Sequence, residues 1–150
     1  MGRMVSLFNW KLDGGFLHYR PNLNSSWKPV IWDEQANIRM QGKDIGGVGM
    51  EDGRFMLVVM GGDGKLFWRI GEPSPYFAPA GIGALEKNED QNAGSFFWNN
   101  GTPMEAKSIT SVVLLDDGRV TIMIVGGDGT GLYTQQERPN STNFTKWQKF

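Results

Sequence analysis

Apolar residues in this chain occur in short runs that are separated by Asp-Gly pairs. The stretch EDGRFMLVVMGGDGKLFW at residues 51–68 aligns with DDGRVTIMIVGGDGTGLY at residues 116–133 by a shift of 65 and no gap. A fainter copy, NWKLDGGFLHY at residues 9–19, matches at a shift of 50 through its Asp-Gly pair. Self-similarity at such periods indicates a repeat architecture, so it is interpreted before any single motif.

Each full copy predicts three antiparallel strands joined by tight turns. Asp-Gly between apolar runs is a strong hairpin signal, because a two-residue type I′ turn needs positive φ at both central positions. The runs FMLVVM and VTIMIV are apolar almost throughout, so both faces of these central strands should be covered. The expected strands are 46–50, 55–60 and 66–70 in one copy and 112–115, 120–125 and 132–135 in the other.

The segments around the two full copies supply further strands. Trp27 and Trp147 are expected to pack in the outer strands. The unit around the faint copy should lack its innermost strand, and the polar connector 35–45 should hold at most a short strand at 37–40. The other expected strands are 5–10, 16–20 and 27–32 in the first unit, a displaced fourth strand with a turn in SFFWNNGTPM (95–104), and a short last strand in FTKWQKF.

A four-stranded antiparallel meander repeated along a chain is the blade of a β-propeller. We therefore expect an all-β fold, with one domain over residues 1–150 and units at about 4–34, 46–104 and 108–150. Propellers close with about four to eight blades. About three blades would then need a second chain to close the ring, which predicts a homodimer or a higher oligomer. A β-trefoil, which also suits three repeats, is the alternative.

Composition excludes several classes of function. The net charge is −1 and no basic block occurs, so we expect no nucleic-acid partner. No apolar run is long enough to span a bilayer, so we expect no membrane insertion. The absence of Cys excludes disulfides, thiol catalysis and Cys-based metal sites. No signal peptide is recognisable, which leaves the cytoplasm or export by a non-standard route.

The motifs that could carry enzyme chemistry are better explained as turns. VGGDGT at 125–130 resembles the phosphate-binding loop of the NAD kinase and diacylglycerol kinase families, but a helix should follow such a loop, and GLYTQQERPNST indicates a strand and a loop. Neither GGDG copy keeps the spacing of a sialidase Asp-box or of calcium-binding repeats. His18 is the only histidine. We expect Asp63 and Asp128 to be turn formers, no metal or cofactor, and no enzyme activity.

Aromatic residues indicate a binding function instead. His18, Trp68 and Tyr133 each stand five residues after a turn Asp, so they should occupy equivalent places in the three units. A flat side chain with a polar edge can stack on a sugar ring and hydrogen-bond a hydroxyl group. Equally, these residues could fill the space between units as core aromatics. The candidate ligand-binding set is His18, Trp68, Tyr133, Tyr19 and Arg69.

The succession D-G-R, an apolar strand, G-x-D-G-x-L-[YFW] and a later Trp resembles the blade of propeller lectins. These include the tachylectin and tectonin types and the fucose-binding propeller lectins of bacteria. The match covers about two thirds of the chain, through 52–68, 117–133 with Trp147, and weakly 13–18 with Trp27. The resemblance implies a lectin that binds glycans in grooves between blades, without catalysis. A viral or surface-appendage scaffold is the competing class, and a sialidase-like or GGDGT kinase-like enzyme comes third.

Overall fold

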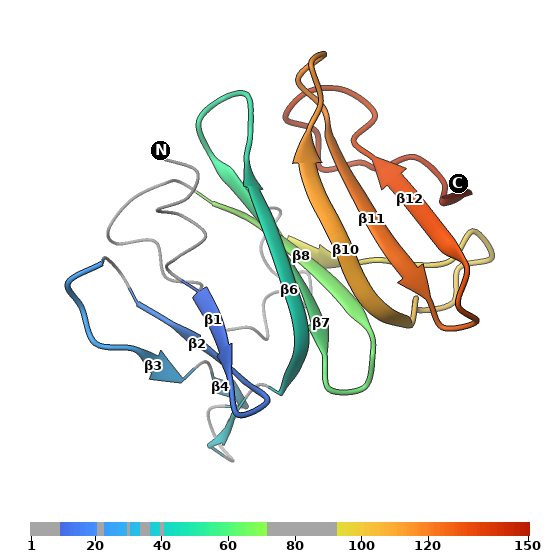
Figure 1. Cartoon of the computed structure of the whole chain (residues 1–150). Coiled ribbons are helices and arrows are strands. Elements are labelled where there is room, and N and C mark those ends of the chain that lie inside the picture. Colours follow the sequence, from blue (N-terminus) through green and yellow to red (C-terminus); the bar gives the residue numbers. More distant parts are fainter. Residues whose placement is uncertain (1–9, 21–22, 30, 34–36, 40, 72–92) are drawn as a thin grey trace.

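The computed structural model describes residues 10–20, 23–29, 31–33, 37–39, 41–71 and 93–150. These residues form strands and turns and no helix, and every strand pairing among them is antiparallel. Two four-stranded sheets, one three-stranded sheet and one two-stranded ribbon result (Figure 1). The prediction of an all-β fold built from antiparallel meanders is therefore confirmed.

In each sheet the strands lie side by side in chain order. The first sheet contains β1 (Trp10–Asp13), β2 (Phe16–Tyr19) and β3 (Lys28–Pro29). The ribbon contains β4 (Ile31–Asp33) and β5 (Ile38–Arg39). The central sheet contains β6 (Gly42–Gly49), β7 (Phe55–Gly61), β8 (Leu66–Gly71) and β9 (Ala93–Ser95). The final sheet contains β10 (Ala106–Leu114), β11 (Val120–Gly126), β12 (Gly131–Gln135) and β13 (Gln148–Lys149).

The central sheet is covered on both faces. Alternate side chains of its strands point to opposite sides, and each side packs against a different sheet. Leu57 and Val59 of β7 pack with Trp10 and Leu17 of the first sheet. Met56, Val58 and Met60 pack instead on the final sheet, and the residues that they meet there include Ile122, Ile124 and Leu132. The prediction that residues 55–60 are covered on both faces is confirmed.

The same prediction holds only in part for residues 120–125, because Thr121 is buried on the face where Met123 and Val125 are not. Ile122 and Ile124 are fully buried against the central sheet. Met123 and Val125, which alternate with them, are only half-buried. The reason is that no further sheet lies on their side of the final sheet in the part of the chain that the structure describes.

The Asp-Gly turns of the two full copies are three-residue loops and not the two-residue type I′ turns that the sequence suggested. In the turn before β8, the Gly61 N–H donates to the Lys65 carbonyl at 2.9 Å and the Gly64 N–H to the Gly61 carbonyl at 3.0 Å. Gly64 has a φ of 84°, whereas Asp63 does not have a positive φ. A three-residue hairpin loop needs a left-handed residue only at its last position. The turns at 51–53, 99–101, 116–118 and 127–129 repeat this pattern.

The side chain before each turn glycine closes the loop. The Lys65 N–H donates to Asp63 Oδ1 at 3.0 Å, and the Thr130 N–H donates to Asp128 Oδ1 at 2.9 Å. This confirms that Asp63 and Asp128 are turn formers. The hydrogen bond from the Thr130 N–H holds the pKa of Asp128 below its usual value of 3.8, because it stabilises the carboxylate.

Valine at either of two turn glycines is expected to destabilise the protein. Gly64 and Gly129 have φ values of 84° and 88°, which a β-branched residue adopts only with strain. We expect Gly64→Val and Gly129→Val each to lower the free energy of unfolding by at least about 1 kcal/mol. Urea denaturation measures this difference.

Gly127→Ala is the matched control for these turn variants. Gly127 belongs to the same loop as Gly129, its φ is not positive, and the nearest atom to an added Cβ is the Glu105 carbonyl oxygen at 3.6 Å. We expect a change within about 0.5 kcal/mol for this control. Wild-type stability of both valine variants would show that the turns do not require a left-handed residue.

Several predicted boundaries need correction. Residues 5–9 of the first predicted strand lie outside the described residues. The strand expected at 27–32 is not continuous, because β3 joins the first sheet and β4 pairs with β5. Pro29 lacks an N–H and so suits the edge of the first sheet. The displaced fourth strand is present as β9, which starts two residues earlier than expected, and the Asn100-Gly101 turn follows it.

The polar connector expected at 35–45 is also partly wrong, because β6 begins at Gly42. Glycine is required in β6 by close packing between the innermost strands of the central and final sheets. A Cβ added to Gly46 would lie 2.8 Å from Val112 Cγ2 of β10. In addition, the Ile109 N–H donates to Asp44 Oδ2 at 2.8 Å, which ties β10 to β6. This strand is therefore dictated by tertiary contacts rather than by local propensity.

Candidate functional site

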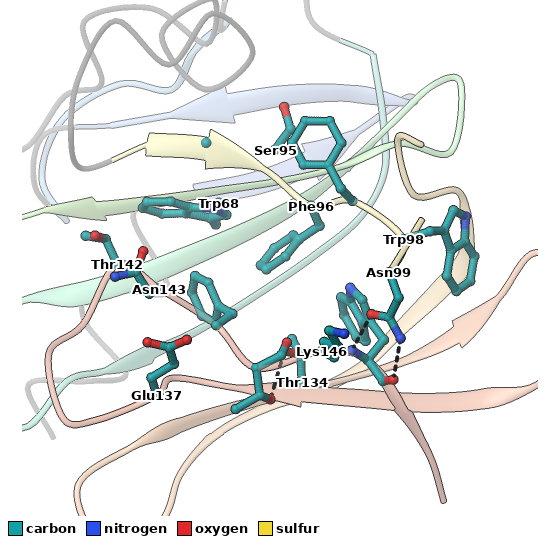
Figure 2. A pocket seen from close by; sticks show the side chains of 15 residues that line it. Trp68, Ser95, Phe96, Trp98, Asn99, Thr134, Glu137, Thr142, Asn143 and Lys146 are labelled. Carbon is teal, nitrogen blue, oxygen red and sulfur yellow. Dashed lines mark hydrogen bonds between the residues drawn. The ribbon is translucent and has the colours of Figure 1, made fainter. Parts of the chain in front are cut away.

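A groove of ≈ 570 Å³ lies between the outer parts of the central and final sheets (Figure 2). One wall consists of Trp68 from β8 together with residues 94–99, which include the end of β9. The other wall consists of Thr134 from β12 and residues 142–147, which lead into β13. Two segments about fifty residues apart in the sequence thus meet to form it.

The floor of the groove is a cluster of aromatic side chains. Phe96 packs edge-on against Phe144 at a centroid distance of 5.2 Å and against Trp147 at 5.6 Å. Trp68 lies 5.7 Å from Phe144. Trp68, Phe96 and Trp147 are buried, whereas Phe144 is partly exposed. Tilted and edge-to-face pairs at these distances are favourable, so the floor is a packed apolar surface.

The rim of the groove is polar and exposed. Glu137, Thr142, Asn143 and Lys146 are all exposed, and Figure 2 shows Thr142 and Asn143 beside Trp68. Together these side chains offer a carboxylate, a hydroxyl, an amide and an ammonium group, which means both donors and acceptors. Their polar ends form no hydrogen bond with another described residue.

Hydrogen bonds hold the two walls in place. Asn99 donates from Nδ2 to the Trp147 carbonyl at 3.2 Å and accepts the Trp147 N–H at 3.1 Å. Thr134 donates from Oγ1 to the Thr145 carbonyl at 2.5 Å. These contacts fix the segment around Trp147 against both sheets. The two walls of the groove are thus joined by hydrogen bonds within the chain.

Of the five candidate residues from the sequence, the structure places Trp68 alone in this groove. Arg69 follows Trp68 in β8 and pairs with Leu57, whose side chain faces the first sheet. Arg69 therefore lies on the opposite face of the central sheet from Trp68. Tyr133 lies on the outer face of the final sheet, where it stacks on Phe150 at 5.8 Å and donates to Gln148 Oε1 at 2.8 Å.

His18 and Tyr19 occupy two faces of the first sheet. Tyr19 packs against Trp10 at 6.0 Å and faces the central sheet, so its neighbour His18 faces away. The expectation that His18 is equivalent to Trp68 and Tyr133 is wrong. The first hairpin has a two-residue loop, Gly14-Gly15, in which both φ values are positive. A change of one residue in loop length moves alternate side chains to the other face.

Sequence reasoning missed most of the groove. Phe96, Trp98, Phe144 and the polar rim were not candidates, although SFFW and NFTKW are both rich in aromatic residues. Trp147 was expected to pack in the outer strand, and it is buried as expected. The signal that could have found them is position: SFFW begins at the end of β9, and NFTKW ends directly before β13, and these are the outer strands of neighbouring sheets.

Other candidate chemistry finds no support in the described geometry. The GGDGT segment is a hairpin turn between β11 and β12, and a strand rather than a helix N-terminus follows it. The described residues hold no group of three His, Cys, Asp or Glu side chains that could bind a metal ion. They also contain no helix long and apolar enough to cross a membrane.

Comparison with protein-family models finds no match to this chain, and comparison with curated proteins finds none either.

Proposed function

We propose that this chain is a carbohydrate-binding protein and that the groove between the central and final sheets is its sugar site. The observation that carries the proposal is the combination of a packed aromatic floor with an exposed polar rim. The C–H face of a pyranose ring suits an aromatic surface, and its hydroxyl groups suit mixed donors and acceptors. No step of covalent chemistry is part of this function.

Size and exposure favour a small, neutral glycan. A groove of ≈ 570 Å³ is within the usual range of small-molecule sites. The rim carries one acidic and one basic side chain, Glu137 and Lys146, so its charge is balanced. Contacts of this kind with one or two sugar rings give affinities in the millimolar to micromolar range, because the ligand contributes few buried atoms.

We further propose that the stacked meanders are blades of a β-propeller, with the groove between two successive blades. Two features support this arrangement. Each four-stranded sheet is a meander in chain order, and successive sheets pack face to face in the same order. A β-trefoil, by contrast, would draw its strands into one shared barrel. The division into units at about 4–34, 46–104 and 108–150 belongs to this proposal.

Glu137→Ala is expected to weaken glycan binding by about tenfold, because it removes a charged hydrogen-bond acceptor from the rim. Glu137 is exposed, so the fold should be unaffected. A glycan array identifies the best ligand, and isothermal titration calorimetry then compares the variant with wild type.

Glu105→Ala is the matched control for this experiment, since Glu105 is exposed and does not line the groove. Its affinity should equal that of wild type. Equal affinity of the two variants would place the sugar elsewhere, and a blank array would favour the scaffold role over the lectin role.

A further inference from the structure

The outer face of the final sheet repeats a surface that is covered elsewhere in the same chain. Val58, Met60 and Trp68 of the central sheet are buried beneath the final sheet. In the alignment of the two full copies, which are 65 residues apart, these positions correspond to Met123, Val125 and Tyr133. Strand pairing confirms the correspondence, because Val58 pairs with Trp68 and Met123 pairs with Tyr133.

Apolar side chains on this outer face are only half-buried, and polar residues such as Ser111, Gln135 and Gln148 lie beside them on the same face. Met123, Val125 and Tyr133 are all of intermediate exposure. Phe150 extends the face, since it stacks on Tyr133 at 5.8 Å and is itself 71% exposed. No sheet covers these side chains in the described part of the chain. A group of incompletely covered apolar side chains of this kind indicates an interaction surface.

The stacking order of the sheets identifies what covers this face. The central sheet covers the Trp10 and Leu17 side of the first sheet, and the final sheet covers the Trp68 side of the central sheet. In both contacts, one face of a sheet thus packs on the opposite face of the next sheet along the chain. Within the described residues, the other face that has no sheet against it is the rear face of the first sheet, which bears Lys11 and His18.

The chemistry of the two uncovered faces is complementary. Lys11 Nζ and Arg20 Cζ lie 4.7 Å and 4.3 Å from the centre of the Trp27 ring, and Asp13 Oδ2 lies 3.7 Å from Lys11 Nζ, so the rear face of the first sheet carries two cations and one carboxylate. The outer face of the final sheet presents the stacked rings of Tyr133 and Phe150. Cations are attracted to the faces of aromatic rings.

From these observations we infer that the outer face of the final sheet binds the rear face of the first sheet of a second copy of this chain, head to tail. Because one face meets a different face, the interface is heterologous and closes into a ring when the rotation allows. Two copies with about three meanders each would give about six, which a propeller ring permits. The inference stands without the sugar site, since none of the residues named on the two faces that it joins lines the groove.

Met123→Lys and Lys11→Glu test the two halves of this interface. Sedimentation velocity over a range of concentrations should show wild type at twice the monomer mass of 16.7 kDa or a higher multiple. Each variant alone should sediment as a monomer, because each alters one face that every interface needs. Wild type that remains monomeric at every concentration would overturn the inference.

Mixing the two variants separates a lost interface from a lost fold. Lys11→Glu keeps the outer face of the final sheet intact, and Met123→Lys keeps the rear face of the first sheet intact. The outer face of one variant can therefore bind the rear face of the other, so the mixture should recover dimers. Misfolded chains could not complement each other in this way. Failure of the mixture to assemble would contradict head-to-tail docking. A dimer that Met123→Lys disrupts and Lys11→Glu leaves unchanged would indicate pairing of two outer faces and would also overturn it. Ser26→Lys, at an exposed position, is the control and should assemble like wild type.

Discussion

Trp68→Ala is expected to lower the free energy of unfolding by about 3–5 kcal/mol, which is the usual cost of truncating a buried aromatic side chain. Trp68 is only 7% exposed and packs between the central and final sheets. Its ring touches Phe144, and the backbone at Gly94 lies close against the indole, where an added Cβ would be 2.9 Å from the ring. Neighbours on both sides cannot collapse fully into the space, so a cavity should remain. Chemical denaturation measures the loss.

Trp98→Ala is the comparison for this variant. Trp98 lines the same groove but is only partly buried, so its truncation should cost distinctly less. Equal losses for the two variants would contradict the assignment of Trp68 to the core of the sheet interface. The comparison also matters for function. Trp68→Ala is expected to destabilise the fold, so loss of sugar binding in this variant does not by itself show where the sugar binds.

Gln136→Met is expected to lower the free energy of unfolding by about 2–5 kcal/mol, because it leaves two buried backbone groups without a hydrogen bond. Gln136 is completely buried. Its Oε1 accepts the Val120 N–H at 2.8 Å, and its Nε2 donates to the Ser141 carbonyl at 2.7 Å. Methionine keeps the volume of the side chain and removes both bonds. The difference in urea midpoint at constant m-value gives the loss.

Gln135→Met is the matched control for this variant. Gln135 is the neighbouring residue in β12, its side chain is half-buried, and its Oε1 accepts only a long hydrogen bond of 3.4 Å from Thr121 Oγ1. We expect a change of less than about 1 kcal/mol there. If Gln136→Met lowered the free energy of unfolding as little as this control, the hydrogen bonds of Gln136 would not be what holds β11 to the loop that leads to the groove.

The strands around the Asp-Gly repeat could be predicted from the sequence because their signals are local. Apolar runs such as Phe55–Met60 between turn residues fix both the strand and its ends. The strand β6 could not be predicted in full, since its Gly42 and Gly46 serve close contacts with other strands. The turn type of the two full copies was predicted wrongly because Asp-Gly suits two-residue and three-residue loops alike, and only the hydrogen-bond pattern separates them.

The candidate site could be predicted only in part for a related reason. Trp68 was found because it repeats with Tyr133 along the sequence. The rest of the groove depends on the contact of Asn99 with Trp147, which lie 48 residues apart, and no local pattern reports such a contact. His18 was placed wrongly because one loop residue fewer reverses the face of the strand that follows.

The most direct test of the sugar site is a two-dimensional ¹H–¹⁵N NMR titration of the wild-type protein with the best glycan from the array. We expect saturable shifts in the indole N–H of Trp98 and in the amide signals of Asn143 and Lys146, with a dissociation constant in the millimolar to micromolar range. These residues line the groove and are not buried in the core. Saturable shifts confined to Tyr133 and Phe150 on the outer face of the final sheet, or no saturable shift with any glycan, would contradict a sugar site in the groove.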